Sequence, residues 1–134
     1  MIVFDASAAV ELILGLPQGH RIQQIADDHD WVIVAPQLLQ TEVLQVLRRW
    51  VKAGLIDDQE AGNAIEVLDS LGIRYFGHDL LRDRIWELKD NLTAYDATYI
   101  ALGELLDAPV LTTDTRMGNA PGNRAQVISL GGQG

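Results

Sequence analysis

Short apolar runs alternate with helical segments along the whole chain, and this alternation restricts the fold more than any other feature of the sequence. The runs occupy residues 2–4, 31–35, 73–76, 109–112 and 126–130. Continuous apolar runs rich in β-branched residues are typical of strands buried on both faces. Strands separated by helices predict a central, mainly parallel sheet with helices on both faces, which is a three-layer α/β/α sandwich.

Helical periodicity fills the intervals between these runs. The clearest helix covers residues 37–52, where Leu39, Val43, Val46 and Trp50 recur at helical spacing. Asp57 or Asp58 can cap the next helix, which runs to about residue 71. We expect further helices at residues 6–14, 18–28, 79–89 and 93–106.

Length and composition indicate one cytoplasmic domain. A chain of 134 residues fits a single domain over 1–134, and a hydrophobic content of 48% supplies its core. We expect a frayed tail at 131–134. The absence of cysteine excludes disulfides, zinc–thiolate sites, iron–sulfur clusters and cysteine nucleophiles, and it agrees with a reducing cytoplasm. We see no signal peptide and no apolar stretch of the roughly 18 residues that span a membrane.

The net charge of −9 restricts how the protein can bind nucleic acid. Nonspecific binding to phosphates depends on Lys and Arg, so the acidic balance argues against it. Cations held by carboxylates are the exception, because they reverse the local sign of the charge. The histidines His20, His29 and His78 are scattered and lack the spacing of metal ligands.

Four acids stand where a soluble domain has least reason to place charge. Asp5 ends the first apolar run, Glu42 lies within the apolar arc of a predicted helix, Asp96 opens an apolar helix, and Asp114 ends a late apolar run. A buried carboxylate costs several kcal/mol unless something pairs with it. Apart from Arg116 beside Asp114, no basic residue is near them in sequence, so a divalent cation is a candidate partner.

The predicted sheet brings three of these acids to one edge. Active sites of parallel sheets form beyond the carboxyl ends of the strands. Asp5 and Asp114 both occupy that position, and Asp96 can point to the same edge from the first turn of its helix. Three acids from distant parts of the chain can therefore converge.

Each acid also has a structural alternative. Asp5 or Ser7 can cap the first helix, and Asp96 can form an arrangement like a capping box with Thr93. Asp114 can form a turn after its strand. Glu42 can reach water, or pair with Arg49 or with an arginine elsewhere.

With these residues in place, the chain resembles the PIN-domain ribonucleases, and most closely the VapC toxins of type II toxin–antitoxin pairs. The resemblance covers almost the whole chain. It rests on four segments in order, which are IVFDASA at 2–8, the segment 36–46 with Glu42, YDATYIAL at 95–102, and LTTDTR at 111–116.

This resemblance implies a PIN-like fold and a metal-dependent endoribonuclease. The matching acids Asp5, Glu42, Asp96 and Asp114 would be both catalytic residues and ligands of Mg²⁺, for which Mn²⁺ can substitute. Phosphodiester bonds of a structured RNA, such as a tRNA or rRNA loop, would be hydrolysed by a metal-activated water. Candidate substrate contacts are Ser7, Thr113, Arg116 and Arg49.

One departure from the family pattern concerns Arg116. Many relatives carry a further acid two residues beyond the position that matches Asp114, and this chain has Arg116 there. A second metal is therefore an open question. Arg116 can instead contact a substrate phosphate or pair with Asp114.

The resemblance also implies protein partners. A cognate antitoxin would hold such a toxin inactive, and the charge of −9 suits a basic antitoxin tail. We expect a homodimer and a toxin–antitoxin hetero-oligomer, with Trp50 and Val51 as candidate contact residues and no membrane partner.

Three other functions compete with this prediction. The first is a non-catalytic PIN-like module that binds metal or RNA. An aspartate-based phosphotransfer domain is disfavoured, because Ser7 stands where phosphatases of that kind need an acid. Cleavage of DNA or flaps ranks below RNA, because the chain has no long insertion to form an arch.

Overall fold

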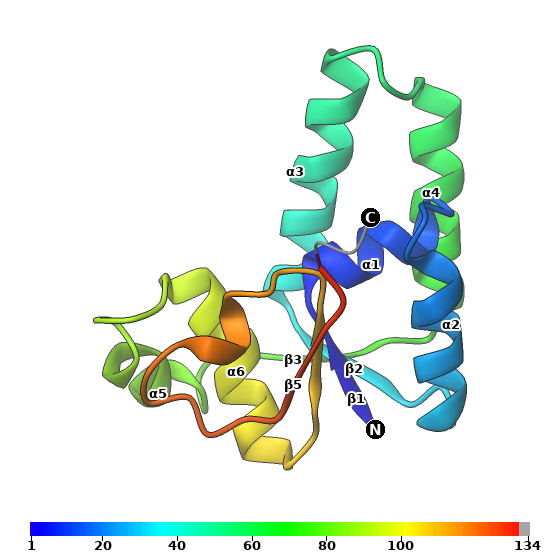
Figure 1. Cartoon of the computed structure of the whole chain (residues 1–134). Helices are drawn as coiled ribbons and strands as arrows, with labels where there is room; N and C mark the ends of the chain where they lie inside the picture. The colour runs from blue at the N-terminus through cyan, green and yellow to red at the C-terminus, as the bar shows by residue number, and fades with distance from the viewer. Residues whose placement is uncertain (132–134) are drawn as a thin grey trace.

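A central sheet of five parallel strands organises the protein (Figure 1). The computed structural model describes residues 1–131. Its strands lie in the order β3-β2-β1-β4-β5, and every neighbouring pair is parallel. Their bounds are β1 Ile2–Phe4, β2 Ile33–Pro36, β3 Arg74–Phe76, β4 Val110–Thr112 and β5 Val127–Ser129. The predicted parallel α/β architecture is confirmed.

Within the described residues, six α-helices surround the sheet and complete the three layers. They are α1 Ala6–Ile13, α2 Gly19–Asp28, α3 Leu38–Lys52, α4 Asp58–Ser70, α5 Arg82–Glu87 and α6 Ala94–Leu106, with the short 3₁₀ helix η1 at Met117–Asn119. Helices α1 and α2 lie on one side of the sheet, and α5 and α6 lie on the other (Figure 1). Helices α3 and α4 form an antiparallel arm that projects beyond the edge where the strands end (Figure 1).

Side-chain caps in the local sequence mark where α4 and α6 begin. Asp57 caps α4 through a complete capping box, in which its side chain accepts from the Glu60 N–H and Glu60 accepts from the Asp57 N–H. Thr93 caps α6 by accepting from the backbone N–H of Asp96 at 3.1 Å. Helix α6 is the central helix of its layer, because residues 97–103 are all buried.

Most predicted bounds agree with the structure to within one residue, and two elements differ by more. Strand β2 begins at Ile33 rather than at 31, because Asp30 and Trp31 adopt left-handed backbone conformations with φ of 57° and 56°. Pro36 is the last residue of this strand, whose predicted end is residue 35. Helix α5 is shorter than the predicted 79–89 and covers only Arg82–Glu87.

The strand order reverses at the centre of the sheet. The chain runs outward from β1 through β2 to β3, and then returns to place β4 on the other side of β1. This is a topological switch point, where ligand sites of open α/β sheets form. The residues that follow β1 and β4 are Asp5 and Thr113–Asp114, so the sheet brings two predicted site residues to this point.

The end of the described chain packs against the same edge. Gly131 is buried, and a Cβ atom at this position would lie 1.7 Å from the carbonyl oxygen of Thr113, so only glycine fits. The other residues of the expected tail, 132–134, lie outside the described residues. Within 1–131, no helix is long and apolar enough to cross a bilayer.

Candidate functional site

Ser7 ties the ends of the two central strands together. Its hydroxyl donates to Asp5 Oδ1 at 2.7 Å and accepts from the backbone N–H of Thr113 at 2.9 Å. The Thr112 hydroxyl in turn accepts from the backbone N–H of Asp114 at 2.9 Å. These short polar contacts fix the β1 and β4 ends relative to each other at the switch point.

Asp5 is the most deeply buried acid of the four, with 5% of its surface exposed. It caps α1 by accepting from the Ala8 N–H at 2.9 Å, so Asp5 rather than Ser7 fills the capping role. The pKa of Asp5 is raised to about 6, and burial is the largest cause. Hydrogen bonds from the Thr112 and Ser7 hydroxyls and the Ala8 N–H lower this pKa in part, and the negative charge of Asp96 raises it. Capping therefore does not remove the energetic cost of this carboxylate.

Glu42 is held by a tyrosine rather than by an arginine. The Tyr99 hydroxyl donates to Glu42 Oε1 at 2.5 Å, which joins α6 to α3. Burial raises the pKa of the half-buried Glu42, the Tyr99 bond lowers it in part, and the Asp96 charge raises it further.

Tyr99 is a functional candidate that the sequence analysis missed. Its side chain is almost fully buried, and burial and the Glu42 contact raise its pKa. The sequence contains one signal for this role, since Tyr99 lies three residues after Asp96 on an apolar helix. A tyrosine buried on such a helix needs a hydrogen-bond partner for its hydroxyl.

Asp96 is the centre of the acidic cluster. Burial raises the pKa of Asp96, the Asp114 charge raises it further, and the Arg116 charge lowers it. Its own negative charge raises the pKa of both Asp5 and Glu42. Asp96 therefore interacts electrostatically with each of the other three acids.

Asp114 differs from the other acids because it has a cation partner. Arg116 donates from its backbone N–H and Nε to Asp114 Oδ1 and from Nη2 to Oδ2, at 2.9, 3.2 and 3.2 Å. These bonds lower the pKa of Asp114. Asp96, Asp114 and Arg116 share a hollow of about 280 Å³, whose other walls are Asn91, Leu92, Thr93 and Met117.

The cluster fits a divalent cation in its chemistry but is not a closed cage. Among residues 1–131, no three His, Cys, Asp or Glu side chains are grouped closely enough to hold a metal ion together. The donors are carboxylate oxygens, which Mg²⁺ and Mn²⁺ prefer. Three of the acids have raised pKa values because their negative charge is buried and mutually repulsive, and a cation relieves both costs.

The predicted substrate contacts separate into two groups. Ser7, Thr113 and Arg116 lie at the acidic cluster, each hydrogen-bonded to one of its residues or to another member of this group. Arg49 does not join them, because it lies on the exposed face of α3 two helical turns beyond Glu42.

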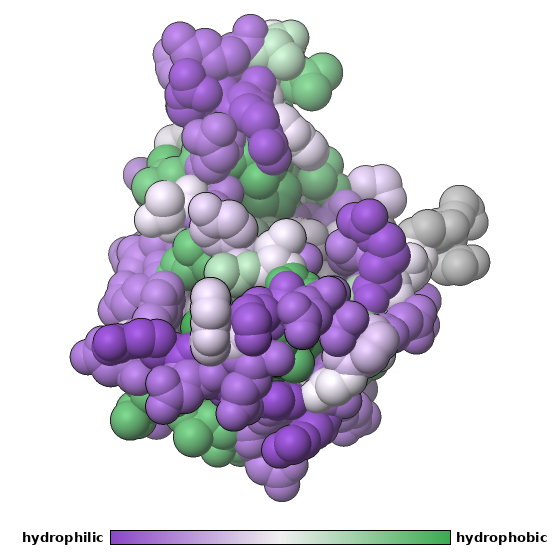
Figure 2. Space-filling model, turned by 90° about the vertical axis from the view of Figure 1, so that its left-hand side faces the viewer, coloured by the Kyte–Doolittle hydropathy of each residue, from purple (hydrophilic) through white to green (hydrophobic). Residues whose placement is uncertain are grey.

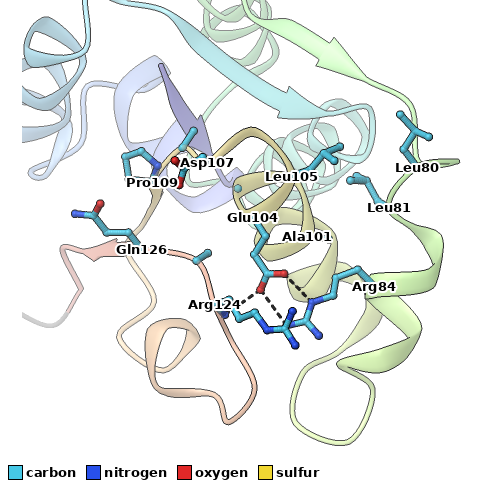
Figure 3. A pocket seen from close by; sticks show the side chains of 13 residues that line it. Leu80, Leu81, Arg84, Ala101, Glu104, Leu105, Asp107, Pro109, Arg124 and Gln126 are labelled. Carbon is cyan, nitrogen blue, oxygen red and sulfur yellow. Dashed lines mark hydrogen bonds and ion pairs between the residues drawn. The ribbon is translucent and has the colours of Figure 1, made fainter.

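A larger hollow of about 410 Å³ lies at the opposite edge of the sheet, where β4 and β5 begin (Figure 3). Two of its charged residues, Arg84 and Glu104, form an ion pair. Arg84 donates from Nε and Nη2 to the two carboxylate oxygens of Glu104 at 2.6 and 3.1 Å, and the Arg124 backbone N–H donates to the same carboxylate at 2.9 Å. This pair lowers the pKa of Glu104, in contrast to the raised values at the switch point.

Comparison with known proteins identifies the family. The sequence model of the PIN domain matches residues 2–123. Ribonuclease VapC1 of Mycobacterium tuberculosis is 42% identical over 127 residues, which cover 90% of each chain. The chain belongs to the VapC family of PIN-domain proteins. Ribonuclease VapC12 of M. tuberculosis is a second relative, 33% identical over 127 residues that cover 95% of this chain and 97% of VapC12.

Solved structures of the VapC family and of other PIN proteins share the fold. M. tuberculosis VapC20 superposes with a TM-score of 0.67 at 16% identity, covering 89% of this chain and 94% of VapC20. FitAcB from Neisseria gonorrhoeae gives a TM-score of 0.69 at 16% identity, covering 97% and 98% of the two chains. At these identities, the likeness establishes the PIN fold alone.

Proposed function

We propose that this VapC-family protein is a metal-dependent endoribonuclease and the toxin of a toxin–antitoxin pair. The observation that carries the proposal is the group of three carboxylates, Asp5, Glu42 and Asp96, whose pKa values are all raised at the switch point of the sheet. Strongly perturbed acids in such a position indicate a functional site. The relatives VapC1 and VapC12 are named as ribonucleases, which supports this reading.

Mg²⁺ is the proposed cofactor, and Mn²⁺ can substitute for it. Asp5, Glu42, Asp96 and Asp114 would hold it, in part through metal-bound water, because in the described part of the chain no three of these side chains are grouped closely enough to bind it directly. A bound divalent ion supplies a more acidic water and positive charge for the phosphate oxygens.

The residues of the chain orient this chemistry. The Ala8 N–H and the Ser7 hydroxyl fix the Asp5 carboxylate, and the Tyr99 hydroxyl fixes that of Glu42. Arg116 balances Asp114 and offers a guanidinium to a substrate phosphate.

The proposed reaction is hydrolysis of a phosphodiester bond. The oxygen of a water forms a bond to phosphorus and the bond from phosphorus to the 3′ oxygen breaks. This leaves a 5′-phosphate and a 3′-hydroxyl, and no side-chain nucleophile is required. The proposed substrate is a structured RNA with an accessible loop, such as a tRNA or a ribosomal RNA hairpin. VapC20, which shares the fold, is described as a sarcin–ricin loop cleaving toxin.

A cognate antitoxin is the proposed protein partner. The net charge of −9 favours a partner with a basic segment. One structure with a TM-score of 0.69 is a toxin–antitoxin complex from Klebsiella pneumoniae. We also propose a homodimer, for which the half-buried Trp50 and Val51 on α3 are candidate contacts.

A non-catalytic PIN-like module is the second candidate. The observation that favours it is the Arg116–Asp114 ion pair, which already satisfies one of the four acids without a metal. In that case RNA or metal would bind without cleavage.

Cleavage of total RNA in the presence of Mn²⁺ separates the two candidates. We expect wild-type protein to cut discrete sites, and the Asp5→Asn and Asp96→Asn variants to lose this activity. Asp28→Asn is the matched control, because it removes an exposed acid at the end of α2. Cleavage that survives in both site variants would reveal a contaminating nuclease and contradict the proposal.

A further inference from the structure

A third hollow, of about 300 Å³, lies beside the acidic cluster on the other side of the first turn of α6. Its walls include Leu38, His78, Arg82, Ile85, Tyr95 and Thr98. We call it the Tyr95 hollow. Thr93 lines the hollow that contains Asp96 and Asp114, and Tyr95 lines the other one, so the two hollows lie on either side of the start of α6.

The helices that position the acids also build the Tyr95 hollow. Tyr95 directly precedes Asp96 in α6, and Leu38 lies one helical turn before Glu42 in α3. A strand of RNA with a phosphate at Asp96 would therefore have a neighbouring nucleotide within reach of this hollow.

Tyr95 presents an aromatic surface at the rim of this hollow. Its side chain is 61% exposed, although it belongs to a helix whose residues 97–103 are buried. Leu38 and Ile85 provide half-buried apolar walls around it. Exposed tyrosines that flank a charged site are typical platforms for stacking unpaired bases of single-stranded RNA.

Two polar groups in the walls suit the edge of a base and a phosphate. The Leu38 N–H donates to His78 Nε2 at 3.3 Å, so a neutral His78 carries its proton on Nδ1 as a further donor. Arg82 is 74% exposed and pairs at 3.1 Å with the fully solvated Asp79. Such exposed pairs are weak, so Arg82 can turn to a phosphate at little cost.

The surrounding surface favours a small planar ligand over a docked helix. Figure 2 views the side of the molecule where α5 lies, and its apolar residues form separate areas among hydrophilic ones. A partner helix needs a continuous apolar stripe. A single base needs only one aromatic face and a few polar contacts.

We propose that the Tyr95 hollow is a nucleobase subsite, in which one unpaired base of an RNA strand stacks on Tyr95 next to the phosphate at the acidic cluster. This inference rests on the proposed ribonuclease function and adds a residue that selects and positions the substrate.

Binding of a fluorescein-labelled octaribonucleotide of mixed sequence tests the subsite. The measurements use the Asp5→Asn background, which keeps the RNA intact, in buffer with Mn²⁺. Stacking on an aromatic side chain contributes about 5- to 150-fold in affinity, so we expect Tyr95→Ala to weaken binding by that factor. Tyr95→Phe keeps the ring and should stay within about twofold of the background.

Trp86→Ala is the matched control, because Trp86 is 69% exposed on α5 but does not line the hollow. An abasic position moved along the oligonucleotide adds a second readout. At one position, loss of the base should weaken binding to the Asp5→Asn background. The same loss should have no effect on binding to the Tyr95→Ala variant. Thermal unfolding should show that the Tyr95 variants fold like the background.

The outcomes separate the subsite from the proposed function. If wild-type protein cuts total RNA but Tyr95→Ala binds the oligonucleotide as well as the background does, the subsite is wrong and the ribonuclease function stands. An equal loss in Trp86→Ala also overturns the subsite. If wild-type protein neither cuts nor binds RNA, both proposals fall.

Discussion

The Tyr99 hydroxyl donates a hydrogen bond to Glu42 Oε1 although the two residues are 57 positions apart in the sequence. The bond connects the arm formed by α3 and α4 with the central helix α6, which also carries Asp96. It therefore sets the position of Glu42 on the arm relative to Asp96 on α6.

Replacing Tyr99 by Phe should loosen Glu42 and raise its pKa further, because the Tyr99 bond is the contact that lowers that pKa. Loss of the bond should reduce the free energy of unfolding by about 1 kcal/mol. Calorimetric titration with Mn²⁺ should show weaker binding, with a larger loss at pH 6 than at pH 8, because protonated Glu42 cannot ligate. Tyr75→Phe, on the half-buried β3, is the control. Equal Mn²⁺ affinity in wild type and Tyr99→Phe would mean that Glu42 takes no part in metal binding.

Removing the Arg116 side chain should strengthen metal binding and weaken RNA binding. Arg116 competes with a cation for Asp114, but the pair is exposed, with 89% of the Arg116 side chain accessible. The expected gain is therefore only about two- to fivefold in Mn²⁺ affinity for Arg116→Ala. RNA affinity should fall, because the guanidinium no longer meets a phosphate. Arg21→Ala, which removes an exposed charge from α2, should change neither. A decrease in Mn²⁺ affinity for Arg116→Ala would contradict the competition.

The sequence predicts the sheet and part of the site for definite physical reasons. The apolar runs locate all five strands. They are clearest for β1, β2 and β4, in which every residue is buried. The alternation of strands and helices then predicts that Asp5 and Asp114 meet at one edge. The left-handed backbone at Asp30 and Trp31 is not predictable in this way, because a tryptophan rarely adopts it. The Tyr99–Glu42 bond depends on how α3 and α6 are placed relative to each other, which local sequence does not encode.

The close packing of α6 against β4 makes Gly103 sensitive to substitution. A Cβ atom there would lie 2.6 Å from Val110 Cγ2 and 3.0 Å from the Ala108 carbonyl oxygen. Overpacking of about 1–3 kcal/mol should exceed the gain in helix propensity, so Gly103→Ala should be destabilising in urea unfolding. Gly62→Ala in α4 is the control, because nothing lies within 4 Å of its added Cβ and it should be stabilising by about 0.5–1 kcal/mol. Equal effects of the two substitutions would contradict the tight packing.

Asp5 should destabilise the metal-free protein at neutral pH. Its pKa rises from 3.8 to about 6 on folding, so between these values the folded state binds more protons than the unfolded state, and stability falls as the pH rises through this window. A shift of this size corresponds to about 3 kcal/mol. Asp5→Asn keeps a side-chain oxygen for the Ala8 N–H but no charge. In EDTA, it should therefore be more stable than wild type by about 1–3 kcal/mol at pH 7.5 and equal to it near pH 4.

Urea unfolding of both proteins at these two pH values measures this difference. Addition of Mg²⁺ at pH 7.5 should make wild type more stable than Asp5→Asn, because only wild type keeps the full set of carboxylates. Asp28→Asn should behave like wild type throughout, because its side chain is exposed. If Asp5→Asn were less stable than wild type in EDTA at pH 7.5, Asp5 would act mainly as a helix cap, and its charge would not be the unpaired cost that a metal relieves.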